Sequence, residues 1–261
     1  MESVCKPLER DTTNPHAPVF IENSAKKGIV VFIHGFMGSP VQFSGLIDIA
    51  YKHGYSATAM LLPGHGGKMK DFSKSTFKCW QDHVNAEIEK LAQTYTSMLL
   101  VGHSMGGLLS INAAVKFPEY IRGIFIIASP FKATIFSAAA IKIGLRKVFG
   151  RKSDPVTAAY NKSNSVKLSP NLIWGLIKPY IEFRKLSRTA RGNLPEIKVP
   201  VTAVYSYADE IAPVESAKTL EAELHGVPFN EILLHDSLHA YYTDKEQTII
   251  GQTLIEALDF L

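Results

Sequence analysis

Short apolar runs rich in β-branched residues alternate along the chain with longer segments in which apolar residues recur every three or four positions. The short runs are typical of buried strands, and the longer segments are typical of amphipathic helices. This alternation predicts an α/β fold with a mostly parallel sheet, helices on both faces and an active site outside the carboxyl ends of the strands. The predicted strands are residues 28–33, 57–62, 98–101, 123–128, 199–205 and 231–234, and the predicted helices are residues 41–53, 76–95, 106–117 and 214–224.

One long stretch, residues 131–196, interrupts the alternation because it contains no clear strand pattern. Asp154-Pro155 and Ser169-Pro170 each have the form of a helix N-cap followed by proline at the first helical position. Further along, Pro179 is expected to end or kink a helix. The stretch is therefore predicted to be a helical insertion in a core made of residues 1–130 and 197–261.

The charge of the chain is concentrated in this insertion. The whole chain has a net charge of +4, but residues 131–196 hold thirteen Lys and Arg against three acids, a net of +10, which leaves the other 195 residues at −6. Apolar residues at 135–149 are interleaved with Lys and Arg at 142–152, a pattern that suits an anionic lipid surface. A cap helix that buries one face and keeps its lysines in water explains the same pattern. No nucleic-acid-binding motif is present, so no nucleic-acid partner is expected.

Composition excludes several other classes of protein. With 46% hydrophobic and 20% charged residues the chain is expected to fold, and no apolar run approaches the roughly 18 residues that cross a bilayer. Residues 1–13 lack the hydrophobic segment of a secretory signal, so a cytoplasmic location is expected. Two cysteines, Cys5 and Cys79, provide neither a disulfide framework nor a metal-binding spacing.

The pentapeptide Gly102-His103-Ser104-Met105-Gly106 follows one predicted strand and opens one predicted helix. A sharp strand-to-helix turn of this kind raises the serine above the sheet, and glycines are needed two residues to either side because the neighbouring backbone comes close. The sequence therefore predicts Ser104 as a nucleophile. A serine that only caps the helix is the alternative.

A serine nucleophile needs a base, and the base needs an acid that holds it in the correct tautomer. His239 lies in the loop directly after the last predicted strand, at the edge of the sheet where Ser104 is expected. His235 is the alternative base, nearer the strand end. Asp209 follows the strand at 199–205 and is the expected acid, with Glu210 as the alternative.

Two backbone N–H groups are also needed to stabilise the negative charge on the substrate oxygen. The amide of Met105, directly after the nucleophile, is one expected donor. The second is expected from the loop after the first long strand, where Ile33-His34-Gly35-Phe36 offers the amide of Phe36.

Together these motifs resemble the α/β-hydrolase superfamily, and within it the small bacterial carboxylesterases and monoacylglycerol lipases. The resemblance covers about residues 28–130 and 197–261. In this superfamily an insertion after the sixth core strand forms a cap over the serine, and residues 131–196 match it in position. The matching pieces are His34-Gly35-Phe36, Leu62-Pro63-Gly64-His65-Gly66, the serine motif, Asp209, and Ser237-Leu238-His239 followed by Asp244-Lys245-Glu246.

The resemblance implies ester hydrolysis through an acyl-enzyme on Ser104, without a metal or an organic cofactor, on short- to medium-chain or monoacylglycerol esters. Aromatic-acyl esters such as feruloyl esters, carbon–carbon bond hydrolysis and acyl transfer use the same residues and remain alternatives, as does a non-catalytic ligand-binding scaffold. The implied partner is a small ester or lipid molecule. The expected walls of its pocket are His34, Gly35, Ile135, Phe136, Trp174 and Ile177.

Overall fold

The computed structural model describes residues 14–25, 27–131, 154–167 and 172–261. Within them lies a seven-stranded sheet with the order β1-β3-β2-β4-β5-β6-β7. Each pair of neighbours is parallel except β1 and β3, so the predicted mostly parallel sheet is confirmed. The strands are β1 (Val19–Ile21), β2 (Ile29–Ile33), β3 (Ser56–Met60), β4 (Met98–His103), β5 (Ile121–Ile127), β6 (Val201–Ser206) and β7 (Phe229–Leu234).

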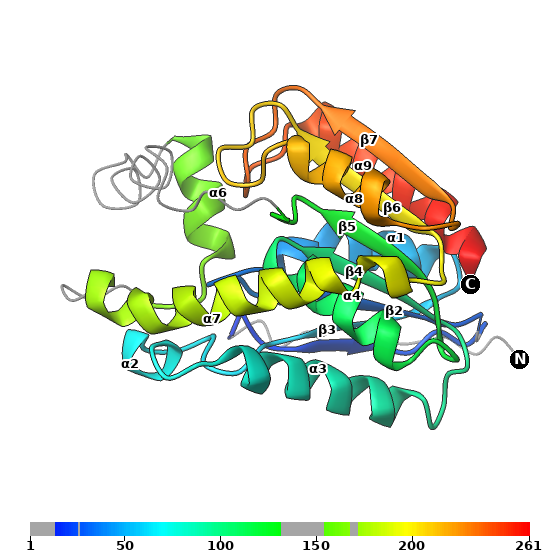
Figure 1. The fold of residues 1–261 in the computed structure, drawn as a ribbon, viewed down its shortest axis with the longest axis horizontal. Helices are drawn as coiled ribbons and strands as arrows, with labels where there is room; N and C mark the ends of the chain where they lie inside the picture. The colour runs from blue at the N-terminus through cyan, green and yellow to red at the C-terminus, as the bar shows by residue number, and fades with distance from the viewer. Residues whose placement is uncertain (1–13, 26, 132–153, 168–171) are drawn as a thin grey trace, which may run out of the picture.

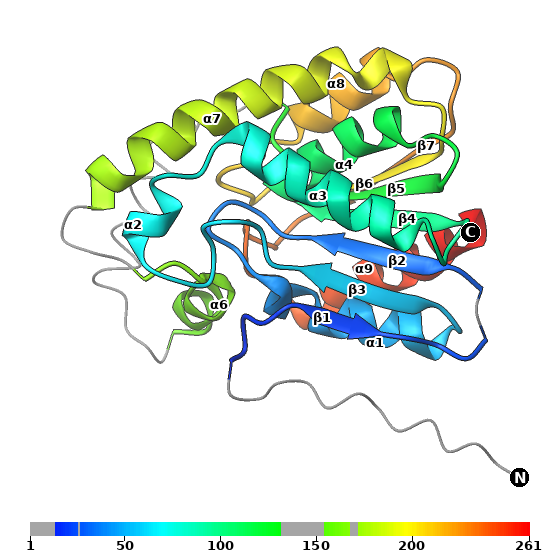
Figure 2. The same cartoon turned by 90° about the horizontal axis from the view of Figure 1, so that it is seen from below.

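Helices cover both faces of the sheet, as Figures 1 and 2 show. One face carries α1 and α9, and the other carries α3, α4 and α8. All four helices predicted in the core are present within a few residues of their expected bounds. The core helices are α1 (Ser44–Lys52), α2 (Met69–Phe72), α3 (Phe77–Leu91), α4 (Met105–Lys116), α8 (Glu215–Glu223) and α9 (Asp244–Ala257), with 3-10 turns at Pro40–Phe43, Leu194–Glu196 and Leu258–Phe260.

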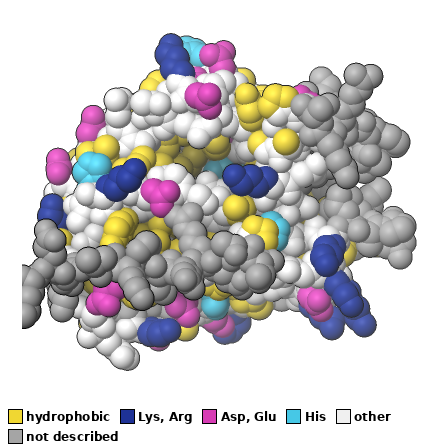
Figure 3. All heavy atoms as spheres, turned by 180° about the vertical axis from the view of Figure 1, so that it is seen from behind, with side chains coloured by type: hydrophobic (Ala, Val, Ile, Leu, Met, Phe, Trp, Pro, Cys, Tyr) yellow, Lys and Arg dark blue, Asp and Glu magenta, His cyan; other side chains and the backbone are white. Residues whose placement is uncertain are grey.

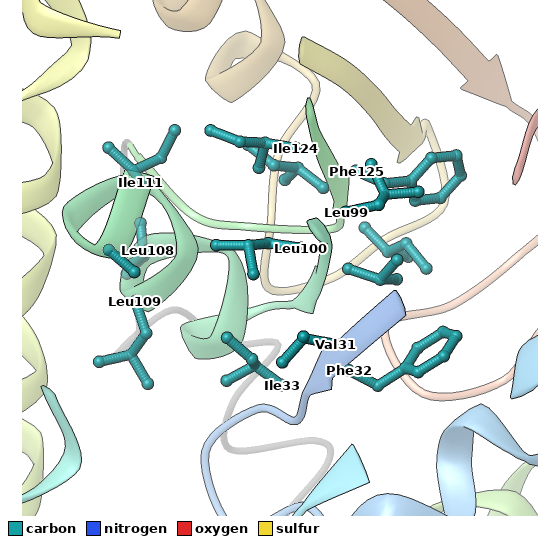
Figure 4. Packing of buried hydrophobic residues seen from close by; sticks show 14 of the residues in the cluster. Val31, Phe32, Ile33, Leu99, Leu100, Leu108, Leu109, Ile111, Ile124 and Phe125 are labelled. Carbon is teal, nitrogen blue, oxygen red and sulfur yellow. The ribbon is translucent and has the colours of Figure 1, made fainter. Parts of the chain in front are cut away.

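The hydrophobic core lies on both sides of the central strands. Every residue of β2, β4 and β6 is buried, which explains why these segments read as unbroken apolar runs rather than as alternating ones. Figure 4 shows Leu100 and Ile124 facing α4, and Phe32 and Phe125 on the opposite side of the sheet. This double packing makes the carboxyl edge of the sheet a rigid support for the loops that follow the strands.

The chain leaves the core between β5 and β6 and forms two described helices, α6 (Pro155–Ser163) and α7 (Leu172–Gly192). Asp154 caps α6, as predicted, because its carboxylate accepts from the Thr157 amide at 3.0 Å and Pro155 is the first helical residue. The other predicted cap, Ser169-Pro170, lies outside the described residues. Among the described residues the insertion follows the fifth strand, β5.

Pro179 was expected to end or kink a helix. Helix α7 continues through Pro179, so the proline does not end it. Proline removes one backbone hydrogen bond and crowds the preceding turn, which costs about 3 kcal/mol in an isolated helix. In this structure α7 packs along α2, α3 and α4, and Pro179 itself is buried. This packing compensates for the missing hydrogen bond.

On the face opposite to Figure 1, hydrophobic side chains form separate patches interrupted by charged ones, as Figure 3 shows. None of the helices in the described parts of the chain is both long enough and apolar enough to span a bilayer.

Candidate active site

Ser104 stands at the turn between β4 and α4 with φ 53° and ψ −116°, a backbone conformation that non-glycine residues rarely adopt. The glycines beside it are required by space. A Cβ on Gly102 would lie 2.4 Å from the Cα of Gly107, and a Cβ on Gly106 would lie 1.8 Å from the carbonyl oxygen of Ile33. Any larger residue at either position would therefore push this turn out of place.

His239 and Asp209 complete a chain of hydrogen bonds to this serine. His239 Nε2 lies 2.9 Å from Ser104 Oγ, and His239 Nδ1 lies 2.9 Å from Asp209 Oδ2. Asp209 is fixed in turn because its Oδ1 accepts from the amides of Ile211 at 2.7 Å and Ala212 at 2.8 Å. Since a carboxylate only accepts, Nδ1 carries the proton and Nε2 is free to accept the serine hydroxyl. The side chains of His239 and Asp209 are 9% and 2% exposed, so water does not compete for these bonds.

The alternative base, His235, and the alternative acid, Glu210, have other partners. His235 is exposed, and its ring stacks on Tyr207 with centroids 5.3 Å apart. The carboxylate of Glu210 accepts from the His239 backbone amide at 3.1 Å and from the Tyr160 hydroxyl. The structure therefore brings Ser104, His239 and Asp209 together and leaves the alternatives outside the chain of hydrogen bonds.

The two expected oxyanion donors lie in turns that flank Ser104. Strands β2 and β4 are neighbours, with Ile33 paired to Gly102, so the loop after β2 emerges beside the serine. A Cβ on Gly35 would lie 3.0 Å from the Cβ of Ser104, which shows how closely this loop approaches. Phe36 follows directly, and Met105 is the first residue of α4, where backbone N–H groups have no partner within the helix.

Buried neutral histidines hold the loop after β2. His65 Nε2 accepts from the Met37 amide at 3.1 Å, and burial lowers the pKa of His65 to about 4. His34 Nε2 accepts from the Leu62 amide at 3.0 Å, and burial lowers the pKa of His34 well below its ordinary value. Both rings are therefore uncharged at neutral pH. His34, expected as a pocket wall, is instead fully buried beneath the pocket, because its ring joins the loops after β2 and β3.

His103, beside Ser104, supports the loop that carries His239. Its Nε2 donates to the carbonyl oxygen of His239 at 2.9 Å, and burial, together with the charge of His239, lowers the pKa of His103 to about 3. His103 is therefore uncharged, and its hydrogen bond joins the turn that carries Ser104 to the loop that carries His239.

A cavity of about 1150 Å³ opens onto Ser104 and His239. Gly35, an expected wall, does line it, but Trp174 and Ile177 do not; these two side chains are 77% and 42% exposed. The other expected walls, Ile135 and Phe136, lie outside the described residues. The insertion contributes a different set of walls, which includes Tyr160 from α6 and Leu176, Tyr180 and Phe183 from α7.

Helix geometry explains why Leu176, Tyr180 and Phe183 of α7, and not Trp174 and Ile177, line the cavity. Residues spaced by three or four share one face of a helix, and Leu176, Tyr180 and Phe183 continue into the buried Leu186 and Ala190. Trp174 and Ile177 belong to a second apolar stripe on another face. The apolar residues that continue this spacing to the C-terminal end of α7, Leu186 and Ala190, identify the face that packs on the core.

No group of three or more His, Cys, Asp or Glu among the described residues is arranged to hold a metal ion.

The chain shares this architecture with known proteins. The family described as serine aminopeptidase, S33 matches residues 24–246. The thermostable monoacylglycerol lipase of Bacillus sp. (strain H-257) is 24% identical over 246 residues, which are 92% of each protein. A structure from work on the metagenome-derived lipolytic enzymes LipS and LipT superposes with a TM-score of 0.75 at 21% identity, over 94% of this chain and 98% of that one. The monoacylglycerol lipase of Paleococcus ferrophilus gives a TM-score of 0.71 at 21% identity, over 92% of this chain and 97% of that one. The chain therefore belongs to the serine aminopeptidase S33 family and is an α/β-hydrolase of the serine esterase class, as its resemblance to small bacterial carboxylesterases and monoacylglycerol lipases predicted.

Proposed function

We propose that the protein hydrolyses carboxylic esters through an acyl-enzyme formed on Ser104. The observation that carries this proposal is the unbroken chain of hydrogen bonds from Asp209 through His239 to Ser104 Oγ, which ends in a large cavity. An ordinary serine hydroxyl is a weak nucleophile, and a neutral imidazole at 2.9 Å is what allows it to react. Asp209 stabilises the imidazolium that forms when His239 takes the proton.

The reaction follows from the positions of these groups. Ser104 Oγ attacks the ester carbonyl while its proton passes to His239 Nε2, and the negative charge on the carbonyl oxygen is stabilised by the amides of Phe36 and Met105. The tetrahedral intermediate then collapses, and His239 gives its proton to the departing alcohol. A water molecule, deprotonated by His239, attacks the acyl-enzyme, and His239 returns this proton to Ser104 Oγ as the acid leaves, which restores both residues.

The walls of the cavity support an apolar acyl group. Leu176, Tyr180 and Phe183 of α7 line the same cavity as Ser104 and His239, so the insertion serves as the cap that completes the binding site. The cavity volume of about 1150 Å³ slightly exceeds the usual range for small-molecule sites, about 300–1,000 Å³. Together with the similarity to monoacylglycerol lipases, this favours short- to medium-chain esters or monoacylglycerols as substrates.

Hydrolysis of peptides from their amino end, which the family description names, fits the cavity less well. An aminopeptidase must bind a free ammonium group, and a carboxylate facing the substrate is the natural partner for it. Among the described residues that line the cavity, Asp244 is the only acid. Glu210 is already bonded to His239 and Tyr160.

The proposal is tested by assaying p-nitrophenyl esters of increasing acyl length, monoacylglycerols, feruloyl esters and aminoacyl anilides in parallel. The wild type is expected to hydrolyse esters with an initial burst from the acyl-enzyme, and Ser104→Ala is expected to lose roughly 10⁴-fold or more in kcat while keeping its circular dichroism spectrum. His239→Ala should be as severe, and His235→Ala should retain activity. Ester hydrolysis that survives in pure Ser104→Ala would overturn the proposal, and preference for the anilides would assign the chain to the aminopeptidases.

Contact with an anionic membrane through the basic residues at 142–152 stays a prediction, because these residues lie outside the described part of the chain. The cytoplasmic location stays a prediction as well.

A further inference from the structure

The residue after the catalytic acid, Glu210, joins two distant parts of the chain. Its Oε2 accepts from the backbone amide of His239 at 3.1 Å, and its Oε1 accepts from the hydroxyl of Tyr160. Asp209 and Glu210, adjacent in sequence, thus hold the same histidine in two ways. Asp209 fixes the orientation of the ring, and Glu210 fixes the position of the backbone that carries the ring.

Tyr160 belongs to α6 of the cap and is only 5% exposed. Burial, followed by the negative charge of Glu210, raises the pKa of Tyr160, so its hydroxyl keeps its proton and donates to the carboxylate. A backbone hydrogen bond with Ala240 also reaches this hydroxyl. Tyr160 therefore contacts the catalytic loop directly at Ala240 and indirectly, through Glu210, at His239.

The residues just after α6 are bonded to the other side of the site. The amide of Ser165 donates to the carbonyl oxygen of Met37 at 2.9 Å, and the Ser165 hydroxyl donates to the carbonyl oxygen of Gly38 at 2.6 Å. Met37 and Gly38 follow directly after Phe36, the expected oxyanion donor. One short segment of the cap thus holds both loops that must be correctly spaced around Ser104.

We propose that Tyr160 and Glu210 are positioning residues for His239, so that helix α6 of the cap sets how well the base engages Ser104. The inference rests on the proposed function. The bonds of both side chains reach the backbone of the loop that presents His239. Because Ser104 Oγ and His239 Nε2 must stay within hydrogen-bond distance, a small displacement of this loop reduces proton transfer without changing the walls of the cavity.

The decisive readout is the second-order rate constant with which an alkyl fluorophosphonate labels Ser104, because this reagent reports on the activated serine whatever the natural substrate is. Tyr160→Phe keeps the ring that lines the cavity and removes only the hydroxyl. It is expected to lower the labelling rate and kcat on p-nitrophenyl esters about tenfold, with KM within about twofold of the wild type. Glu210→Ala is expected to lower both by at least as much.

Two further variants separate positioning from general damage. Glu210→Gln keeps an oxygen that accepts from the His239 amide, so it should recover most of the labelling rate lost in Glu210→Ala. The double variant Tyr160→Phe/Glu210→Ala should lose less labelling rate than the product of the two single losses, because the bond of the hydroxyl to the carboxylate is missing in either single variant. Tyr207→Phe, on an exposed ring stacked on His235, is the matched control and should label as the wild type does.

Additive effects in the double variant would overturn the inference, and so would wild-type labelling of Tyr160→Phe with only KM changed. Thermal melts of each variant show whether a loss of labelling reflects unfolding. If it does, Glu210→Gln would fail to restore the labelling rate, and the inference would be overturned. Wild-type protein that the fluorophosphonate does not label at all would overturn the proposed function itself, which keeps the two failures distinct.

Discussion

The hydroxyl of Ser129 donates a hydrogen bond to the carbonyl oxygen of Ser104 at 2.7 Å. Ser129 follows β5, and its own carbonyl oxygen accepts from the Tyr205 hydroxyl at 2.7 Å. Since Ser104 has a positive φ, a conformation that costs about 1–3 kcal/mol, something must stabilise the turn. The bond from Ser129, just after the neighbouring strand β5, does so.

Ser129→Ala is therefore expected to lower the free energy of unfolding by about 1–2 kcal/mol and to reduce kcat for ester hydrolysis. Denaturant titration and steady-state kinetics measure the two effects. Ser73→Ala removes a hydroxyl that also donates to a backbone carbonyl, that of Lys70, but far from the site, and is the matched control. Equal effects of the two substitutions would show that the bond to Ser104 has no special role.

Gly35→Ala tests the close approach of the loop after β2 to Ser104. The new methyl group would lie 3.0 Å from the Cβ of Ser104 and 3.1 Å from His103 Nδ1, so the loop or the serine must shift. A displaced oxyanion donor is expected to lower kcat about 100-fold, with a smaller effect on KM. Gly192→Ala, where a Cβ meets nothing within 4 Å, should leave the kinetics unchanged. Wild-type turnover in Gly35→Ala would remove this loop from the mechanism.

Leu176→Trp tests which stripe of α7 faces the substrate. The larger side chain fills part of the cavity, so the preferred acyl chain of p-nitrophenyl esters should become shorter. Trp174→Ala removes a 77% exposed ring and should leave the chain-length profile as it is. A profile that moves with Trp174 and not with Leu176 would place the substrate on the other stripe.

Stability is expected to fall as pH drops from 7 toward 5. His34, His65 and His103 all have folded-state pKa values below the ordinary 6.5, so the unfolded chain binds more protons in this range than the folded chain. Each contributes stability that is complete above about pH 6.5 and declines by up to about 1.4 kcal/mol per pH unit below it. Urea titrations at pH 7, 6 and 5 measure the slope. His65→Gln should make the slope shallower, because it removes one of the three contributing groups.

The central sheet and the loops of the site follow from local sequence patterns. Unbroken apolar runs define strands packed on both faces, and each of Ser104, Asp209 and His239 comes soon after such a run, so topology alone takes them to one edge of the sheet. Strand β1 was not predicted, because it has only three residues, is half-buried and pairs antiparallel at the margin of the sheet.

What the sequence does not reveal depends on contacts between distant segments. On α7, the stripe Trp174, Ile177 and Ile181 is spaced much like the stripe that lines the cavity, and periodicity does not say which of two apolar faces meets the core. Tyr160 and Glu210 are 50 residues apart, and neither lies in a recognisable motif with the other. Such pairings become visible only once the chain is folded.

The pairing of Ile33 with Gly102 across β2 and β4 has a consequence for protein engineering. The spacing between the loop after β2 and Ser104 is set first by the backbone ladder of two adjacent strands, about 4.8 Å apart, and the cap adds the bonds from Ser165 to Met37 and Gly38. Caps from related hydrolases can therefore be grafted onto this core to change the substrate. A working chimaera must still supply a hydroxyl for the carbonyl oxygen of Gly38 and a donor for the carboxylate of Glu210.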